Sequence, residues 1–194
     1  MRHVIVGAGP AGVVAAETIR KRQPQAEIAL IAGEAGEPYA RMAIPYVLTG
    51  KIQEEGARLR KGPDFYKSLG IRLVAGRAAK LDAQKRELTL ADGVKLPYDR
   101  LLIATGASAI SPPIPGIDLP GVRHCWTMDD ARAIVARAKK GSNVVLIGAG
   151  FIGCIVLESL VERGVKLTVV EAESRMLPKM MDEAGGALVK RWCE

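Results

Sequence analysis

Short β-branched runs and longer apolar stretches with helical spacing alternate at both ends of the chain. The runs Val4–Val6 and Val144–Ile147 each lead into a glycine-rich turn and then an apolar helical stretch, the first of which is Ala11–Arg22. A second pair of runs, Glu27–Ile31 and Lys166–Val170, follows these helices. Apolar runs of this length that alternate with helices are typical of buried parallel strands in α/β folds. The pattern therefore predicts two strand–helix–strand units.

The turn between strand and helix carries nearly the same text in both units. It reads Gly7-Ala8-Gly9-Pro10-Ala11-Gly12 in the first and Gly148-Ala149-Gly150-Phe151-Ile152-Gly153 in the second. In a dinucleotide-binding turn one glycine permits the tight bend, another lets the backbone approach a pyrophosphate, and the third lets helix and strand pack closely. The helix N-terminus adds free N–H groups and the positive end of its dipole. One such turn also occurs where nothing binds, but two correctly placed copies predict two nucleotide sites.

An acidic residue follows the second strand of each unit. Glu171 stands directly at the strand end, whereas Ala32 and Gly33 separate Glu34 from the corresponding end. An acid about 20 residues after the glycines is placed to accept hydrogen bonds from ribose hydroxyls. Because a carboxylate repels a 2′-phosphate, Glu171 predicts a preference for NADH over NADPH. The alternative for both acids is a solvated charge at the strand end that binds nothing. This alternative has more weight for Glu34 than for Glu171.

The region between the two units has a different pattern. Its short runs, bounded by turn residues, predict an antiparallel meander inserted into the parallel fold, over Ile71–Gly76, Ala78–Asp82, Glu87–Leu90 and Lys95–Pro97. A short helix is expected between Pro63 and Gly70. The segment Tyr98–Ala107 then predicts a return to a buried strand. Its Thr105-Gly106 end would approach a ligand at the carboxyl edge of the sheet.

A proline- and glycine-rich segment, residues 107–121, is expected to act as a stiff linker. We place the domain boundary within it, which divides the chain into residues 1–114 and 115–194. Besides the helix after the second glycine turn, two helices are expected in the second part, over Thr127–Lys140 and Glu183–Trp192.

Composition narrows the class of protein. With 194 residues, 48% of them hydrophobic, the chain can bury a core. It has no apolar run long enough to predict a membrane span and no signal-peptide pattern. The three cysteines, Cys125, Cys154 and Cys193, are widely spaced, which favours a reducing cytoplasm and argues against a disulfide framework or a metal site. The net charge of +7 is dispersed and only 4% of residues are aromatic, so we expect no nucleic-acid binding.

The order of these motifs resembles the pyridine nucleotide–disulfide oxidoreductase superfamily of flavoproteins. The resemblance covers essentially the whole chain and implies an α/β fold with two Rossmann-like dinucleotide-binding domains. An FAD-binding domain would span residues 1–114, with the inserted meander, and a partial NAD(H)-binding domain residues 115–194. The residues implied to face FAD are Gly7, Gly9, Pro10, Ala11, Gly12, Glu34, Arg41, Pro45, Ala79, Ala104, Thr105 and Gly106. Those implied to face NADH are Gly148, Gly150, Phe151, Ile152, Gly153 and Glu171.

The segment Pro38–Tyr46 discriminates within the superfamily. Members that reduce disulfides or peroxide carry a redox cysteine there, and alignment on Pro45 puts Met42 at that position. Methionine cannot form a thiolate, so neither activity is expected. The Tyr39-Ala40-Arg41 text is instead similar to rubredoxin and ferredoxin reductases and to the flavin part of nitrite reductases. This similarity implies that Arg41 contacts an FAD phosphate or ribose, with a surface arginine as the alternative.

Many relatives also place a lysine–glutamate ion pair beside the flavin. The corresponding residues here are Tyr46 and Ile155, so both charges are absent together. Because the lysine and the glutamate are both absent, neither leaves an unpaired charge buried beside the flavin. Lys51 is a candidate substitute for the missing lysine.

The resemblance implies an FAD-dependent NADH oxidoreductase. Hydride would pass from NADH to the flavin, and electrons would leave for a small acidic electron-transfer protein or a fused reductase domain. No catalytic acid, base or nucleophile and no metal is expected. Phe151 would shield the flavin face before nicotinamide enters, with simple helix packing as the alternative.

The chain also lacks the Gly-Asp pair with which family members return to the FAD domain. It is therefore expected to be an N-terminal fragment, and its unpaired sheet edge is expected to favour a homo-oligomer. A truncated, non-catalytic nucleotide-binding module is the alternative function.

Overall fold

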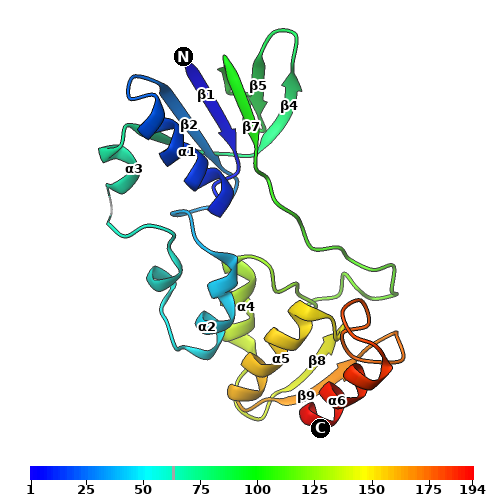
Figure 1. The fold of residues 1–194 in the computed structure, drawn as a ribbon. Helices are drawn as coiled ribbons and strands as arrows, with labels where there is room; N and C mark the ends of the chain where they lie inside the picture. Colours follow the sequence, from blue (N-terminus) through cyan, green and yellow to red (C-terminus); the bar gives the residue numbers. More distant parts are fainter. Residues whose placement is uncertain (63) are drawn as a thin grey trace. The chain divides into compact units, whose positions relative to one another are not determined.

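A computed structural model describes residues 1–62 and 64–194 and forms two compact units. The first unit comprises Met1–Ala40 and Ala57–Ser108, and the second comprises Arg41–Gly56 and Ala109–Glu194. Figure 1 shows the elements of each. The predicted division at residues 114 and 115 stays a prediction. The packing of residues 41–56 with the second unit was not anticipated from the sequence.

The first unit is built on a four-stranded parallel sheet with the order β3-β2-β1-β7. Its strands are β1 (Arg2–Val6), β2 (Glu27–Ala32), β3 (Ile71–Ala75) and β7 (Arg100–Ile103). Helix α1 (Pro10–Arg22) connects β1 to β2, and the short helix α3 (Phe65–Ser68) precedes β3, as predicted, although Pro63 lies outside the described residues.

Both faces of this sheet are covered by apolar side chains. On one face Ile5, Ile28 and Leu30 pack against Val13 of α1 and Tyr66 of α3. On the other face the cluster consists of sheet and meander residues, namely Val4, Val6, Ala29, Ile31, Leu88, Leu90, Leu96 and Tyr98. Burial on both faces explains why β1 and β2 appear in the sequence as continuous apolar runs.

The meander consists of β4 (Ala78–Asp82), β5 (Glu87–Leu90) and β6 (Lys95–Pro97), paired antiparallel. The prediction that Ile71–Gly76 begins this meander is wrong, because the segment forms β3 and pairs parallel with β2. Ile71 and Leu73 pack on the helix side of the sheet and Val74 on the meander side. A strand that is apolar on both faces fits a covered parallel sheet and not a one-sided meander.

Strand β7 also corrects an expectation. The strand exists where the sequence predicts it, but it lies at the edge of the sheet and is largely exposed. The side chain of Ile103 is 63% exposed. Its apolar sequence suggested a buried strand, whereas burial depends on neighbours that the local pattern does not reveal.

The second unit contains two parallel strands, β8 (Asn143–Ile147) and β9 (Lys166–Val170), connected by helix α5 (Phe151–Glu162). Helices α4 (Met128–Arg137) and α6 (Glu183–Cys193) precede and follow this motif. Val144, Leu146 and Leu167 pack against α5. On the opposite face of the sheet Val145 is 62% exposed, Ile147 53% and Val170 50%.

Helix α4 begins where predicted and ends earlier. Thr127 and Asp130 form a reciprocal capping box, in which each side chain accepts a hydrogen bond from the other residue's backbone. The helix ends at Arg137, so the expectation that it continues through Lys140 is wrong. Ala138 leaves the helical conformation, and the Lys139 N–H turns to the Ser142 hydroxyl at 3.2 Å. The local turn therefore replaces the last predicted helical turn.

Residues 41–56 contain the short helices η1 (Arg41–Ala43) and α2 (Ile44–Thr49), and the first residues of η2 (Glu54–Ala57). The Arg163 guanidinium donates to the carbonyl oxygens of Leu48, Val135 and Ala138 at 2.6, 3.0 and 2.9 Å. The Lys51 Nζ lies 2.7 Å from Oε1 of Glu162 at the end of α5. These contacts tie the segment to the helices of the second unit.

Candidate nucleotide-binding sites

The first glycine-rich turn has the geometry that close packing of helix on strand requires. Gly7 adopts a φ of +112°, and a Cβ at this position would lie 2.1 Å from the carbonyl oxygen of Ala104. A Cβ on Gly12 would lie 1.9 Å from the carbonyl oxygen of Gly7. At Gly9, by contrast, no described atom lies within 4 Å of such a Cβ. Two glycines are therefore required by packing, whereas the third faces open space.

The second turn repeats the positive φ of the first glycine and the packing of the third, but a Cβ on Gly148 would meet no described atom within 4 Å. Gly148 has a φ of +98°, and a Cβ on Gly153 would lie 2.2 Å from the Gly148 carbonyl oxygen. A Cβ on Gly150 would again meet no described atom within 4 Å. The open space above the middle glycine is the feature that close approach of a pyrophosphate needs.

Each turn leads directly into a helix whose first N–H groups are available. Gly9 and Gly150 are the N-caps of α1 and α5, and among the described residues neither helix start receives a side-chain cap. Uncapped N–H groups and the helix dipole together favour an anion at this position. The residues that follow, Pro10, Ala11, Phe151 and Ile152, are exposed.

Phe151 stands at the start of α5 and is 53% exposed. Packing on the helix stays the alternative interpretation. Shielding of a flavin by this ring stays a prediction.

The acid of the second turn is held by backbone amides. The Glu171 carboxylate accepts hydrogen bonds from the N–H of Ala149 at 2.6 Å and from the N–H of Glu173 at 3.0 Å. These bonds, with that of Glu173 the larger cause, hold the pKa of Glu171 below its usual value. The carboxylate is thus ionised and placed beside the glycine turn.

The acid of the first turn is held differently. The Tyr39 hydroxyl donates to Oε2 of Glu34 at 2.5 Å, and this contact is partly buried. The sequence carries no signal for this pair.

Two further predicted segments lie in the first unit. The N–H of Ala104 donates to the carbonyl of Val6 at 2.8 Å, which places the start of Ala104-Thr105-Gly106 against the glycine turn. In the meander, Ala78 pairs with Leu90 and Lys80 pairs with Thr89. Ala79 is therefore an extra residue in a bulge, and its backbone lies outside the regular pairing.

Arg41 and Pro45 lie in the second unit. The Arg41 guanidinium donates to the carbonyl of Trp126 at 2.5 Å and lies 5.1 Å from the centre of the Trp126 ring. The carbonyl of Pro45 accepts a hydrogen bond from Ser159 of α5 at 3.3 Å. Contact of these residues with FAD stays a prediction.

The Pro38–Lys51 segment contains no cysteine. The Met42 side chain is 72% exposed and that of Tyr46 is 56% exposed. Lys51 pairs with Glu162 at the C-terminal end of α5, far along the helix from its glycine turn.

The cysteines form no disulfide among the described residues. Cys125, Cys154 and Cys193 are all free thiols. Burial raises the pKa of Cys125 to about 11 and also raises that of Cys154, which disfavours the thiolate in both.

The described part of the chain contains no cluster of three or more side chains suited to a metal ion. No described helix is long and apolar enough to cross a membrane.

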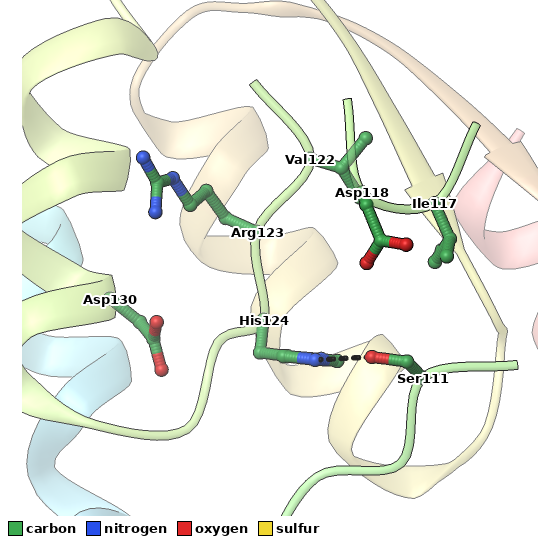
Figure 2. Close-up of a pocket in the computed structure, with 7 residues that line it drawn as sticks. All are labelled: Ser111, Ile117, Asp118, Val122, Arg123, His124 and Asp130. Atoms are coloured by element: carbon green, nitrogen blue, oxygen red, sulfur yellow. Dashed lines mark hydrogen bonds between the residues drawn. The ribbon is translucent and has the colours of Figure 1, made fainter. Parts of the chain in front are cut away.

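One cavity in the second unit was not foreseen. It measures about 260 Å³ and is lined by Ser111, Ile117, Asp118, Val122, Arg123, His124 and Asp130. Figure 2 shows Ser111 and His124 facing each other, with 3.1 Å between Oγ and Nε2. Most of these residues belong to or adjoin the proline-rich segment, where no spacing pattern marks them as a site.

Known proteins resemble the chain over its whole length. The family described as pyridine nucleotide-disulphide oxidoreductase matches residues 1–193. The chain is 34% identical over 203 residues to NADH oxidase of Methanocaldococcus jannaschii, covering all of this chain (100%) and 45% of that protein. It is 31% identical over 191 residues to rubredoxin-NAD(+) reductase of Pseudomonas putida, covering 98% of this chain and 50% of that protein.

Among solved structures, it resembles putidaredoxin reductase in its covalent complex with putidaredoxin. The TM-score is 0.89 at 27% identity, with 99% of this chain and 47% of that chain covered. The chain spans about half the length of the curated relatives it matches. The match of nearly every residue, together with two equivalent glycine turns on parallel α/β sheets, shows that the chain belongs to the pyridine nucleotide-disulphide oxidoreductase family.

Proposed function

We propose that the protein binds FAD at the first glycine turn and NADH at the second, as part of an FAD-dependent NADH oxidoreductase. The observation that carries this proposal is the open space above Gly9 and Gly150, each at the start of an uncapped helix. When bound, FAD supplies a ring that accepts hydride from NADH and passes electrons on singly or in pairs. The relatives named NADH oxidase and rubredoxin-NAD(+) reductase support the same class of activity.

The chain's own residues bind and orient the two nucleotides. Backbone N–H groups after Gly9 and Gly150 would face the pyrophosphates. Ala104, Thr105 and Gly106 would border the flavin side of FAD, and the backbone of the bulged Ala79 would face adenine. In the second unit Glu171 would accept hydrogen bonds from a ribose diol and repel a 2′-phosphate. No residue is assigned the role of acid, base or nucleophile.

Electrons would leave to a small redox protein or an attached reductase domain. The putidaredoxin complex and rubredoxin-NAD(+) reductase support a small protein as acceptor. The net charge of +7 would favour an acidic one. Met42, at the position of the redox cysteine in disulfide-reducing members, supports a route without a covalent thiol intermediate.

Two properties accompany this proposal. The three free thiols favour the reducing cytoplasm as the compartment. The bare apolar face of β8 and β9 favours a homo-oligomer.

The test is an absorbance titration of the purified protein with FAD, followed by anaerobic addition of NADH or NADPH. We expect stoichiometric FAD binding and bleaching of the flavin band by NADH, with slower bleaching by NADPH. FAD binding without bleaching by either nucleotide would favour the alternative, a non-catalytic nucleotide-binding module. No FAD binding at all would contradict the proposal.

A further inference from the structure

The two glycine turns differ at their second residue. In the second turn the N–H of Ala149 donates to the Glu171 carboxylate at 2.6 Å, and the carbonyl of Ala149 accepts from the N–H of Leu177 at 2.9 Å. Ala8 holds the equivalent position in the first turn, and its backbone makes neither of these bonds with a described residue. Ala149 is 1% exposed, whereas Ala8 is only partly buried. The chain that follows β9 thus holds the second turn from both sides.

Leu177 donates its hydrogen bond from an unfavourable backbone conformation. Its φ is +52°, in the left-handed region, where the Cβ of an L-residue comes too close to the following carbonyl oxygen. Among the described residues only one other non-glycine residue has a positive φ, namely Arg86 in the exposed turn between β4 and β5. A bulky, buried residue keeps such a conformation only where its surroundings impose it.

The loop around Leu177 supplies this constraint. The Leu177 side chain is 9% exposed, and its carbonyl accepts the N–H groups of Met180 and Met181 at 2.9 and 3.0 Å. The Arg175 guanidinium donates to the carbonyls of Pro178 and Met181 at 3.2 and 3.0 Å. These bonds close the loop on itself and hold Leu177 within it.

Helix α6 packs directly on this loop. Gly186 of α6 is buried, and a Cβ there would lie 2.8 Å from the carbonyl oxygen of Met176 and 2.9 Å from the Cβ of Arg175. Such a close approach leaves the loop little room to shift. The position of the Leu177 N–H is therefore determined by the packing of the loop, and we expect this donor to be in place before a nucleotide binds.

We propose that Leu177 is a positioning residue of the NADH site, whose N–H fixes the Ala149 peptide and with it the glycine turn before the nucleotide binds. This inference rests on the proposed function and adds a determinant of affinity that only the second turn has. The N–H groups that would face the pyrophosphate begin directly after Gly150, the neighbour of Ala149. A turn that is already ordered loses less conformational freedom on binding, which strengthens binding.

The experiment measures the dissociation constants of NADH and FAD by fluorescence for the wild type and for variants of Leu177. Leu177→Ala removes the buried side chain but keeps the Cβ that disfavours a positive φ, so the backbone should relax and the N–H should leave Ala149. We expect NADH binding to weaken about three- to tenfold and FAD binding to stay unchanged. Leu177→Gly adopts the same φ without strain and is expected to bind NADH more tightly than Leu177→Ala.

The matched control is Leu160→Ala. Leu160 lies in α5, is 4% exposed and packs against the second sheet, so the same truncation there should lower the Tm but change NADH affinity by less than about twofold. The order of the two Leu177 variants is a further control, because loss of packing alone would make glycine worse than alanine. Hydrogen exchange of the wild type adds a test without substitution, since the Leu177 amide should be protected before NADH is added.

The outcomes separate this inference from the proposed function. If the wild type binds NADH but Leu177→Ala binds it within about twofold, or Leu177→Gly binds it more weakly than Leu177→Ala, the inference is overturned and the proposed function stands. An equal loss of NADH affinity in Leu160→Ala overturns it as well. If the wild type does not bind NADH, the proposed function fails and the inference fails with it. Should both Leu177 variants fail to fold, a wild-type Leu177 amide that exchanges freely until NADH is added overturns the inference by itself.

Discussion

The two glycines at the start of α5 are predicted to respond in opposite ways to the same added methyl group. In Gly153→Ala the new Cβ would lie 2.2 Å from the carbonyl oxygen of Gly148 and 3.1 Å from its carbon. In Gly150→Ala it would meet no described atom within 4 Å, and the backbone there is extended, with φ −75° and ψ −174°. One substitution thus tests packing, and the other tests the space left for a ligand.

The cost of Gly153→Ala follows from the overlap. The Gly148 carbonyl must move by about 1 Å, and overpacking of this kind costs about 1–3 kcal/mol. Alanine regains about 0.5–1 kcal/mol through its better helix propensity. The balance is a net loss of up to about 2.5 kcal/mol; at the middle of this range, about 1 kcal/mol, the Tm of a unit of this size falls by about 4–8 °C.

Gly150→Ala should leave the fold nearly unchanged. Alanine is a poorer N-cap than glycine, but it also restricts the unfolded chain, and the two effects nearly cancel within about 0.5 kcal/mol. Its methyl group, however, occupies the space that a pyrophosphate would enter. We expect NADH binding to weaken by about tenfold or more, which corresponds to about 1.4 kcal/mol.

Thermal denaturation followed by circular dichroism gives the first quantity, and titration of NADH fluorescence gives the second. The expected result is a lowered Tm for Gly153→Ala and a normal Tm with weakened NADH binding for Gly150→Ala. A wild-type Tm in Gly153→Ala would refute the packing argument. Wild-type NADH affinity in Gly150→Ala would refute the placement of the pyrophosphate.

Three other perturbations test individual contacts. The hydrogen bonds from Arg2 lower the pKa of Asp99 to about 2, so the stabilisation that this pair gives is present above the ordinary value of 3.8 and is lost as the pH falls toward 2. The Tm of Asp99→Asn should therefore lie below that of the wild type at pH 7 and match it at pH 2. A difference in Tm that stays constant with pH would contradict this. Because the folded pKa of Glu171 is lowered, Glu171→Gln should lose the full stabilisation above about pH 4.5 and progressively less as the pH falls below that value. The same variant should narrow the preference for NADH over NADPH, and an unchanged ratio of affinities would count against the assigned role. Arg163→Ala leaves three carbonyl oxygens without their hydrogen-bond donor, and each lost bond costs about 1 kcal/mol of folding free energy. Hydrogen exchange in residues 44–49 should become faster. Protection equal to that of the wild type would show that other contacts hold this segment.

The sequence was sufficient for the parts of the fold that are determined locally. Strand, glycine turn and helix are contiguous in both units, so β-branched runs and the glycine spacing place them correctly. Close packing of helix on strand was expected at the third glycine of each turn, and the structure shows Gly12 and Gly153 against the carbonyl oxygens of Gly7 and Gly148. The overlap geometry bears out this reasoning.

Sheet membership was harder to predict because it depends on distant partners. The run Ile71–Ala75 is as short as the meander strands beside it, and only its pairing with β2 identifies it as part of the parallel sheet. In the same way, the apolar residues of β7 are no guide to burial at a sheet edge. The hydrogen bond from Tyr39 to Glu34 was also beyond the sequence, because it depends on the bridge between Tyr39 and Arg58.

The placement of residues 41–56 has a consequence for the order of folding. This segment leaves the ribosome before any of its partners in α4 and α5, and the first unit cannot close its sheet until the chain has returned through β3 and β7. Each unit is therefore discontinuous in sequence, and neither can be excised as a single stretch of chain. Early in synthesis the segment has no packing partner, because α4 and α5 are encoded about a hundred residues later. Long-range contacts of this kind are expected to slow folding.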